Sequence, residues 1–230
     1  MEDLVRYSLI KEKLKREFLL LQGKGCVWKK CTYCDYYNDV SDNPFEINKK
    51  VIEKVTGETG VIDVINSGSI MELDADTLDA LYEKIREKHI HTMWCEAHWI
   101  YRNKLAGFAS RFPGVNVKFR TGIETFNPEL RKSWNKGIPE DVTAEEVAKY
   151  FKGVCLLVGV KGQTKEIIKS DIELALKYFE YFSVNIFVEN TTDVKRDVEL
   201  VDWFKSDIYP SICDNDKVEV LFENTDLGVG

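Results

Sequence analysis

The chain has 230 residues, of which 44% are hydrophobic and 31% charged, which is the composition of an ordinary globular protein that can bury one sizeable core. Its formal net charge of -7 argues against a general phosphate-binding surface, and so against a long nucleic acid as partner. No run of residues is long and apolar enough to span a membrane. With six cysteines and no signal-peptide-like start, we expect a cytoplasmic protein.

The chain begins with a stretch of mixed charge, Met1–Arg16, that predicts a leading helix. Beyond it, short runs of β-branched and aromatic residues predict six strands. These strands are Phe18–Gln22, Val61–Asn66, Thr92–Glu96, Val115–Thr121, Val154–Val160 and Val184–Val188.

Apolar residues between the strands have the spacing of helices. One helical face follows Asp76, an N-cap type of residue, and a second follows Gly162. The residues on these faces are Leu78, Leu81, Ile85 and Lys88, and then Ile168, Ile172, Ala175, Leu176 and Phe179.

Strands that alternate with helices require right-handed crossovers and therefore form a parallel sheet. We predict an α/β fold, a partial (β/α)6 barrel of the TIM type, in a single domain over residues 1–230. The core barrel covers about residues 18–206 and the C-terminal tail covers residues 207–230. Within the tail, Lys217–Leu227 is expected to add an edge strand.

Three cysteines, Cys26, Cys31 and Cys34, lie in one loop, residues 22–38, after the first predicted strand. Three thiolates on one loop can hold three irons of a cubane cluster and leave the fourth iron open to a small molecule. A structural zinc site instead needs four protein ligands, usually with a second pair of Cys or His. The other cysteines and the histidines form no such pair: Cys95, Cys155, Cys213, His89, His91 and His98.

Small, acidic and turn-forming residues follow the later strands, where a parallel barrel places its functional groups. These segments are Asn66–Ser69, Trp94–Glu96, Arg120–Thr125, Asn135–Gly137 and Gly159–Thr164. Together with the cysteine loop, they resemble, in order and over about residues 18–188, the motifs of the radical S-adenosylmethionine (SAM) superfamily.

The sequence departs from the usual pattern of that superfamily in three places. Four residues rather than three separate Cys26 from Cys31, so that the loop must bulge. Ser67-Gly68-Ser69 replaces the common glycine-glycine-glutamate, and Lys161 stands where proline is usual.

The resemblance implies a [4Fe-4S] cluster held by Cys26, Cys31 and Cys34, and SAM as the second cofactor. In such enzymes one electron from the cluster cleaves SAM and releases a 5′-deoxyadenosyl radical, and the protein orients the reactants. An external donor such as flavodoxin or ferredoxin supplies that electron. The residues expected to bind SAM are Tyr33, Ser67, Gly68, Ser69, Glu96, Thr121 and Glu124.

The chain has no room for an added RNA-binding domain, so that the resemblance implies a free small molecule as substrate. We expect a lyase that acts on a deazaguanine base, with Asp35 and Glu189 accepting hydrogen bonds from that base or its amine. The catalytic residue is not assigned, and its candidates are Glu96, His98 and Glu189.

Other interpretations stay open at this point. The protein could be a radical enzyme that modifies tRNA or a protein, or a non-catalytic module in which the cysteines hold zinc. Single residues also have structural interpretations: Gly68 as part of a tight turn, His98 as a hydrogen-bonding residue, Cys95 as a small buried apolar residue, and Tyr33 as packing beneath the loop.

Overall fold

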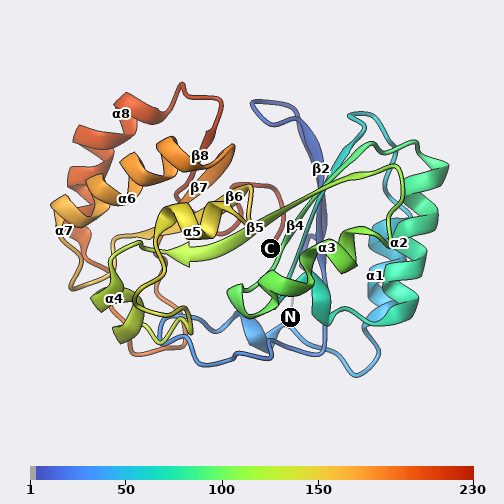
Figure 1. Cartoon of the computed structure of the whole chain (residues 1–230), viewed down its shortest axis with the longest axis horizontal. Coiled ribbons are helices and arrows are strands. Elements are labelled where there is room, and N and C mark those ends of the chain that lie inside the picture. Colours follow the sequence, from blue (N-terminus) through green and yellow to red (C-terminus); the bar gives the residue numbers. More distant parts are fainter. Residues whose placement is uncertain (1–3) are drawn as a thin grey trace. The chain divides into compact units, whose positions relative to one another are not determined.

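The computed structural model describes residues 4–230 and contains eight strands whose order in the sheet follows the sequence (Figure 1). β1 pairs with β2 antiparallel, whereas β2 with β3, β3 with β4, and each pair from β5 to β8 are parallel. The strands are β1 Tyr7–Ile10, β2 Arg16–Leu21, β3 Val61–Asn66, β4 Thr92–Glu96, β5 Asn116–Glu124, β6 Gly153–Val158, β7 Tyr181–Ile186 and β8 Val218–Leu221.

Helices connect the parallel strands, and several of them begin with a side-chain cap. Asp74 caps α2 by accepting the Thr77 N–H, and Thr164 caps α6 by accepting the Ile167 N–H. The helices are α1 Pro44–Ile52, α2 Ala75–Glu87, α3 Leu105–Ala109, α4 Pro128–Ser133, α5 Ala144–Ala148, α6 Lys165–Tyr178, α7 Val198–Trp203 and α8 Tyr209–Ile212. The segments η1 Tyr36–Asn38, η2 Ile70–Glu72 and η3 Trp99–Lys104 are 3-10 helices, and η4 Phe204–Ile208 is a π-helix.

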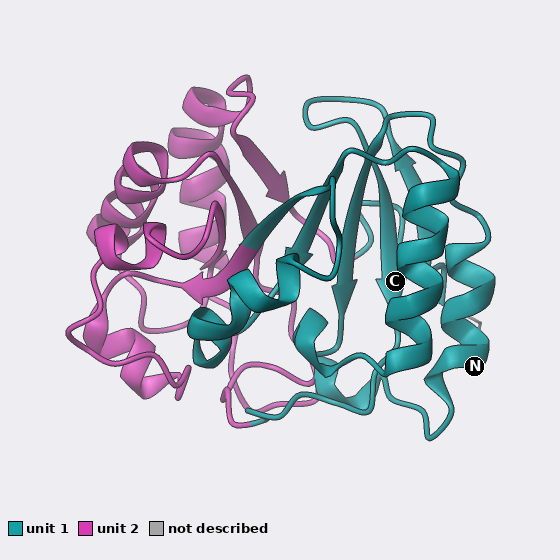
Figure 2. Ribbon diagram, turned by 45° about the vertical axis from the view of Figure 1, so that its right-hand side comes forward, with its two compact units in different colours: residues 1–29, 36–119, 225–230 teal, residues 30–35, 120–224 magenta. Residues whose placement is uncertain are grey.

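The chain divides into two compact units (Figure 2). Unit 1 comprises the chain up to residue 29, residues 36–119 and residues 225–230, and unit 2 comprises residues 30–35 and 120–224. Unit 1 fully buries Leu19 and Val64 from its strands and Leu81 from α2. Unit 2 fully buries Phe182 from β7 and Ala175 from α6. Each unit therefore has an apolar interior of its own.

The six predicted strands are present, with boundaries that differ by up to three residues at an end. The tail also adds the expected strand, because β8 lies within Lys217–Leu227 and pairs with β7. The predicted helix over Met1–Arg16 is wrong in its described part, residues 4–16. There Tyr7–Ile10 forms a strand against β2, and the charged residues after it make the turn between the two, with Lys13 at a φ of 49°.

The cap of α2 was also assigned to the wrong residue. Asp74, two positions before Asp76, accepts the Thr77 N–H at 2.8 Å, and Lys88 ends the helix instead of continuing its face. In the stretch that the structure describes, no helix has the length and apolar character needed to cross a bilayer.

A buried carboxyl group links α6 to the segment after β5. Asp171 of α6 accepts the backbone N–H of Phe126 at 2.7 Å and is only 4% exposed. Burial raises the pKa of Asp171 to about 6, although hydrogen bonds and the Arg131 guanidinium favour the charged form. Arg131 is itself buried, and its Nη2 donates to three carbonyl oxygens in the segment 139–142.

Because its pKa is higher in the folded than in the unfolded chain, Asp171 stabilises the fold most below the unfolded pKa and loses this contribution as pH rises through about 6. Asp171→Asn keeps the hydrogen-bond acceptor and removes the titration. Between about pH 4 and 7, the metal-free wild-type protein should lose about 2–3 kcal/mol of unfolding free energy relative to the variant. Urea unfolding followed by circular dichroism measures this free energy at each pH. If the unfolding free energies of the two proteins changed in parallel with pH, the prediction would be wrong.

Candidate active site

The part of the cysteine loop that carries Cys31 and Cys34 is tied to unit 2 by hydrogen bonds. The Thr32 N–H donates to the Trp134 carbonyl at 3.1 Å, and Asn135 Nδ2 donates to the Lys30 carbonyl at 3.0 Å. The Cys34 N–H bonds the Cys31 carbonyl at 3.4 Å and closes a turn between the two thiols. These hydrogen bonds fix the backbone of the two residues.

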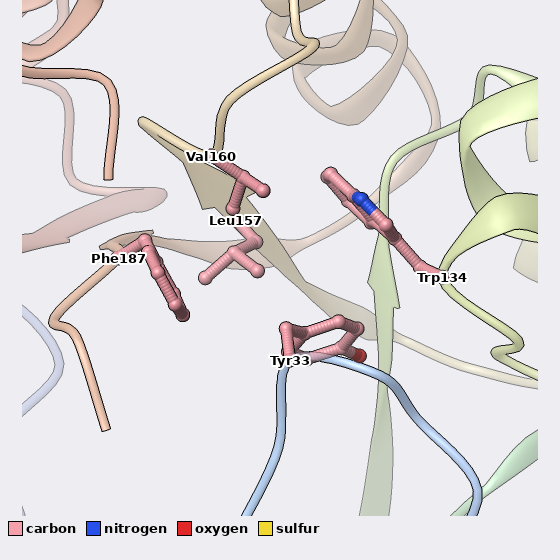
Figure 3. Packing of buried hydrophobic residues seen from close by; sticks show 5 residues of the cluster. All are labelled: Tyr33, Trp134, Leu157, Val160 and Phe187. Atoms are coloured by element: carbon pink, nitrogen blue, oxygen red, sulfur yellow. The ribbon is translucent and has the colours of Figure 1, made fainter. Parts of the chain in front are cut away.

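Tyr33 anchors the same segment in an apolar cluster. It is 8% exposed and packs with Trp134, Leu157, Val160 and Phe187, all in unit 2 (Figure 3). The Tyr33 and Trp134 rings meet edge to face with centroids 5.6 Å apart. Cys31 and Cys34 pack against this cluster from the loop side. Packing is thus one established role of Tyr33, as the structural interpretation of the sequence proposed.

An ion pair lies beneath the loop. Lys136 Nζ is 2.8 Å from Glu124 Oε1, both side chains are 11% exposed, and Nζ also donates to Tyr33 Oη at 3.2 Å. Burial, the Glu124 charge and the Cys31 and Cys34 thiolates raise the pKa of Tyr33 well above its usual value. Burial alone would lower the pKa of Lys136, but the negative charges of Glu124, Cys31 and Cys34 outweigh it and raise that pKa. Lys136 is therefore a cation in the folded protein.

Glu124 reaches Lys136 because β5 ends in an irregularity. The pairing of β5 with β6 shifts register between Gly122 and Glu124, and Glu124 has a φ of 65°. A Cβ atom at Gly122 would collide with the Glu124 carboxylate and lie 3.0 Å from Lys136 Nζ. Bulges of this kind redirect side chains, commonly near active sites. The bulge and the glycine together make room for the ion pair.

In unit 1, Cys26 lies against the Ser67–Ser69 segment that follows β3. A Cβ atom at Gly68 would lie 3.1 Å from the Cys26 Cα and 3.2 Å from the Gly25 carbonyl oxygen, and would collide with the Glu72 carboxylate. Glu72 accepts the Ser69 N–H at 3.1 Å and the Tyr101 hydroxyl at 3.0 Å. Gly68 thus allows close approach of its backbone to that of Gly25 and Cys26.

His98 is held by unit 1 in a mainly structural way. Its ring stacks on Trp28 of the cysteine loop, with centroids 5.6 Å apart and 17° between the planes. The backbone N–H of His98 donates to Ser69 Oγ at 2.9 Å. The ring Nδ1 accepts the Ile100 N–H at 3.3 Å as the cap of η3. This bond assigns the ring proton to Nε2.

Asp35 and the segment after β7 come together in unit 2. Asp35 Oδ2 accepts the Thr191 N–H at 3.0 Å and the Thr191 hydroxyl at 2.8 Å, and Asn190 Nδ2 donates to the Tyr33 carbonyl at 2.8 Å. The exposed Glu189 accepts the Arg196 N–H at 3.1 Å. The two residues expected to bind substrate are therefore connected through Asn190 and Thr191.

Glu96 ends β4, as predicted, and is partly buried. Thr121 is fully buried and lies within β5, because this strand continues beyond its predicted end to Glu124. Among the described residues, Ser67 Oγ and Thr121 Oγ1 are buried hydroxyl oxygens without a hydrogen-bond partner. Such atoms in a native fold call for a ligand or water.

Sequence reasoning did not assign Lys136 and Asn190 to the site. Lys136 was noted only within an Asn-Lys-Gly segment, and a lysine between Asn135 and Gly137, both at positive φ, marks a tight turn that can turn the lysine inward. Asn190 follows directly on Glu189, but its bond to a backbone carbonyl 157 positions away has no sequence signal.

Within residues 4–230, no three His, Cys, Asp or Glu side chains converge closely enough to hold a metal ion; Cys26 belongs to unit 1, whereas Cys31 and Cys34 belong to unit 2. The donor set nevertheless fits an iron–sulfur cluster, because all three side chains are thiols outside any disulfide and are partly exposed. Repeated parallel β/α units with this loop define the class of radical SAM enzymes with a partial (β/α) barrel.

A solved structure described as "queuine lyase from Clostridium spiroforme bound to SAM and queuine" is 42% identical to this chain. The match covers 99% of this chain and 100% of that one, with a TM-score of 0.95. No family model and no curated protein sequence matches the chain. The protein belongs to the queuine lyase family of radical SAM enzymes, and the predicted superfamily, fold class and lyase activity are confirmed.

The close approach at Gly68 can be tested by Gly68→Ala. The added methyl group must displace Glu72 and the backbone at Cys26, so that we expect the variant to lose about 1–3 kcal/mol of unfolding free energy and to bind less iron after anaerobic reconstitution. Gly107→Ala is the matched control, because a Cβ atom there meets nothing within 4 Å. Equal stability and iron content in the two variants would rule out the proposed contact.

Proposed function

We propose that this protein is a queuine lyase, which releases the deazaguanine base preQ1 from queuine by breaking the bond between the cyclopentenediol ring and the amine. The observation that carries this proposal is the 42% identity, over 99% of the chain, to a queuine lyase bound to SAM and queuine. Such a reaction salvages a precursor of queuosine. It also agrees with the expectation of a small-molecule substrate.

In this proposal Cys26, Cys31 and Cys34 hold a [4Fe-4S] cluster, and residues 1–230 act as one catalytic domain. When bound, the cluster and SAM supply a 5′-deoxyadenosyl radical that can remove a hydrogen atom from the cyclopentenediol ring. An external donor such as flavodoxin or ferredoxin provides the electron. The residues proposed to contact SAM are Tyr33, Ser67, Gly68, Ser69, Glu96, Thr121 and Glu124.

Gly68 would let the backbone come close to SAM, and Ser67 and Thr121 have buried hydroxyl groups to offer to it. Glu124 is already paired with Lys136 at 2.8 Å, so that its contribution to SAM binding would be made from within this ion pair. His98, whose Nδ1 caps η3, can exchange a proton only through Nε2. It stays a candidate catalytic residue together with Glu96 and Glu189.

Carboxylates would orient the substrate, because queuine carries an amine that is protonated at neutral pH and a base edge that donates hydrogen bonds. Both bonds that Asp35 accepts from Thr191 end on Oδ2, so that Oδ1 can accept a bond from the base. Glu189 is exposed, and its partners among the described residues are the Arg196 N–H and, at 3.9 Å, the Lys195 ammonium group. It can therefore turn towards a cationic ligand.

We also propose that the protein works in the cytoplasm. Within residues 4–230 none of the six cysteines forms a disulfide, which agrees with a reducing compartment.

The proposed reaction is tested by incubating reduced, reconstituted protein with SAM and queuine under anaerobic conditions. 5′-Deoxyadenosine and preQ1 should form together, and Cys31→Ala should lose both products because one iron ligand is missing. Chromatography with mass detection measures them. Formation of the nucleoside without preQ1 would reject queuine as substrate and leave the enzyme class intact.

Orientation by Glu189 is tested with Glu189→Gln. Loss of a charge-assisted hydrogen bond to the substrate should raise KM for queuine about tenfold with a smaller change in kcat. Glu173→Gln, at an exposed position of α6, is the matched control and should behave as wild type. If KM is the same in both variants, Glu189 has no part in substrate binding.

A further inference from the structure

A buried cation lies next to the part of the cysteine loop that carries two of the three thiols. Lys136 Nζ contacts Tyr33 Oη at 3.2 Å, and Tyr33 stands in sequence between Cys31 and Cys34. The side chain is 11% exposed, as is that of its partner Glu124. Neither charge is needed for the packing of Tyr33, whose ring already lies in the apolar cluster of unit 2.

Hydrogen bonds of Lys136 and of the two residues before it keep this lysine in place. Trp134 and Asn135, which directly precede it, bind the loop through the Thr32 N–H and the Lys30 carbonyl. The Lys136 N–H bonds the Arg131 carbonyl at 3.2 Å. The ammonium group is thus fixed relative to Cys31 and Cys34, instead of sampling solvent as a surface lysine does.

A fixed charge in a poorly hydrated site acts strongly on a redox centre nearby. Coulomb interactions grow as the effective dielectric constant falls, and here both charges are largely withdrawn from water. Reduction adds an electron to a cluster that is already held by thiolates, so that a neighbouring cation favours the reduced state and a neighbouring anion opposes it. The potential of iron–sulfur clusters responds to net charge and hydrogen bonding in this way.

We propose that the Lys136–Glu124 pair sets the reduction potential of the cluster, with Lys136 making reduction easier and Glu124 limiting this effect while holding the ammonium group in place. The pair acts through the cluster and is not itself part of the bond-breaking step. This proposal rests on the cluster ligands assigned under the proposed function, but not on queuine as substrate.

The test is a set of three variants whose cluster potentials are measured by redox titration followed by electron paramagnetic resonance, without SAM. The variants are Glu124→Gln, Lys136→Met and the double variant. Glu124→Gln leaves the ammonium group unbalanced and should shift the potential to a more positive value than wild type. The double variant has the same residue at position 124 but no cation, and should lie below Glu124→Gln.

Lys136→Met, measured at a pH where Glu124 stays ionised, should shift the potential to a more negative value than the double variant. The two comparisons against the double variant separate the effect of each charge. Lys136→Arg keeps the charge and should stay close to wild type. Iron content and circular dichroism identify a variant that has lost its cluster or its fold.

Lys132→Met with Glu140→Gln is the matched control. Lys132 Nζ and Glu140 Oε1 are 2.7 Å apart, but the side chains are 69% and 53% exposed, so that water screens their charges. This double variant should have the wild-type potential.

Equal reduction potentials in Glu124→Gln and the double variant would overturn the proposal. Loss of the cluster from both variants, while the wild-type protein retains it, would also overturn it, because the ion pair would then serve only to assemble the loop. Failure to cleave queuine in a protein that binds the cluster would reject the proposed substrate and leave this proposal intact. Absence of a cluster from the wild-type protein would reject both.

Discussion

The burial of Tyr33 is the constraint on which the rest of the site depends. Its ring fills an apolar cluster in unit 2, and burying such a side chain contributes about 1.5–3 kcal/mol. Because Tyr33 lies between Cys31 and Cys34, the same burial fixes both thiols, and the Asn190 amide and Thr32 N–H bonds add to it. Protein contacts of this kind restrict the loop and so reduce the conformational entropy that cluster binding must overcome.

The buried ion pair beneath Tyr33 needs several local irregularities at once. Glu124 occupies a left-handed conformation, which costs about 1–3 kcal/mol for a residue other than glycine. Gly122 leaves space for the carboxylate, and the turn of Asn135 and Gly137 directs Lys136 inward. A buried pair of this kind seldom adds net stability. The pair is therefore better explained by an effect on the neighbouring thiols than by a contribution to folding.

Much of the fold could be predicted because β-branched runs in a parallel sheet are buried on both faces and stand out from the helices between them. The strand Tyr7–Ile10 could not be predicted, because a short edge strand of mixed polarity has no sequence pattern that distinguishes it from a helix. Its pairing with β2 also depends on the turn at Lys13. Asp74 and Asp76 are equally good caps in sequence, and only the backbone decides between them.

The site was predictable where it follows strand ends and not where it depends on side-chain direction. Gly68 and Thr121 lie at or near the ends of strands that the sequence marked. The contact of Glu124 with Lys136 crosses a register shift in β5, and no sequence pattern reports whether a strand end is regular or bulged. The sequence therefore shows Lys136 only as part of a turn, whereas in the structure it is a buried cation paired with Glu124.

The unusual spacing of the cysteines can be explained by a difference between two parts of the loop, one fixed by packing and one exposed. The interval from Cys31 to Cys34 cannot change, since it encloses Tyr33 and a turn closed by the Cys34 N–H. The interval from Cys26 to Cys31, in contrast, can change in length. Val27 is 68% exposed, and Lys29 at a φ of 45° turns its N–H to Cys26 Sγ at 3.5 Å. An extra residue is absorbed in this exposed turn without moving the buried anchor, so the first interval is free to vary in length.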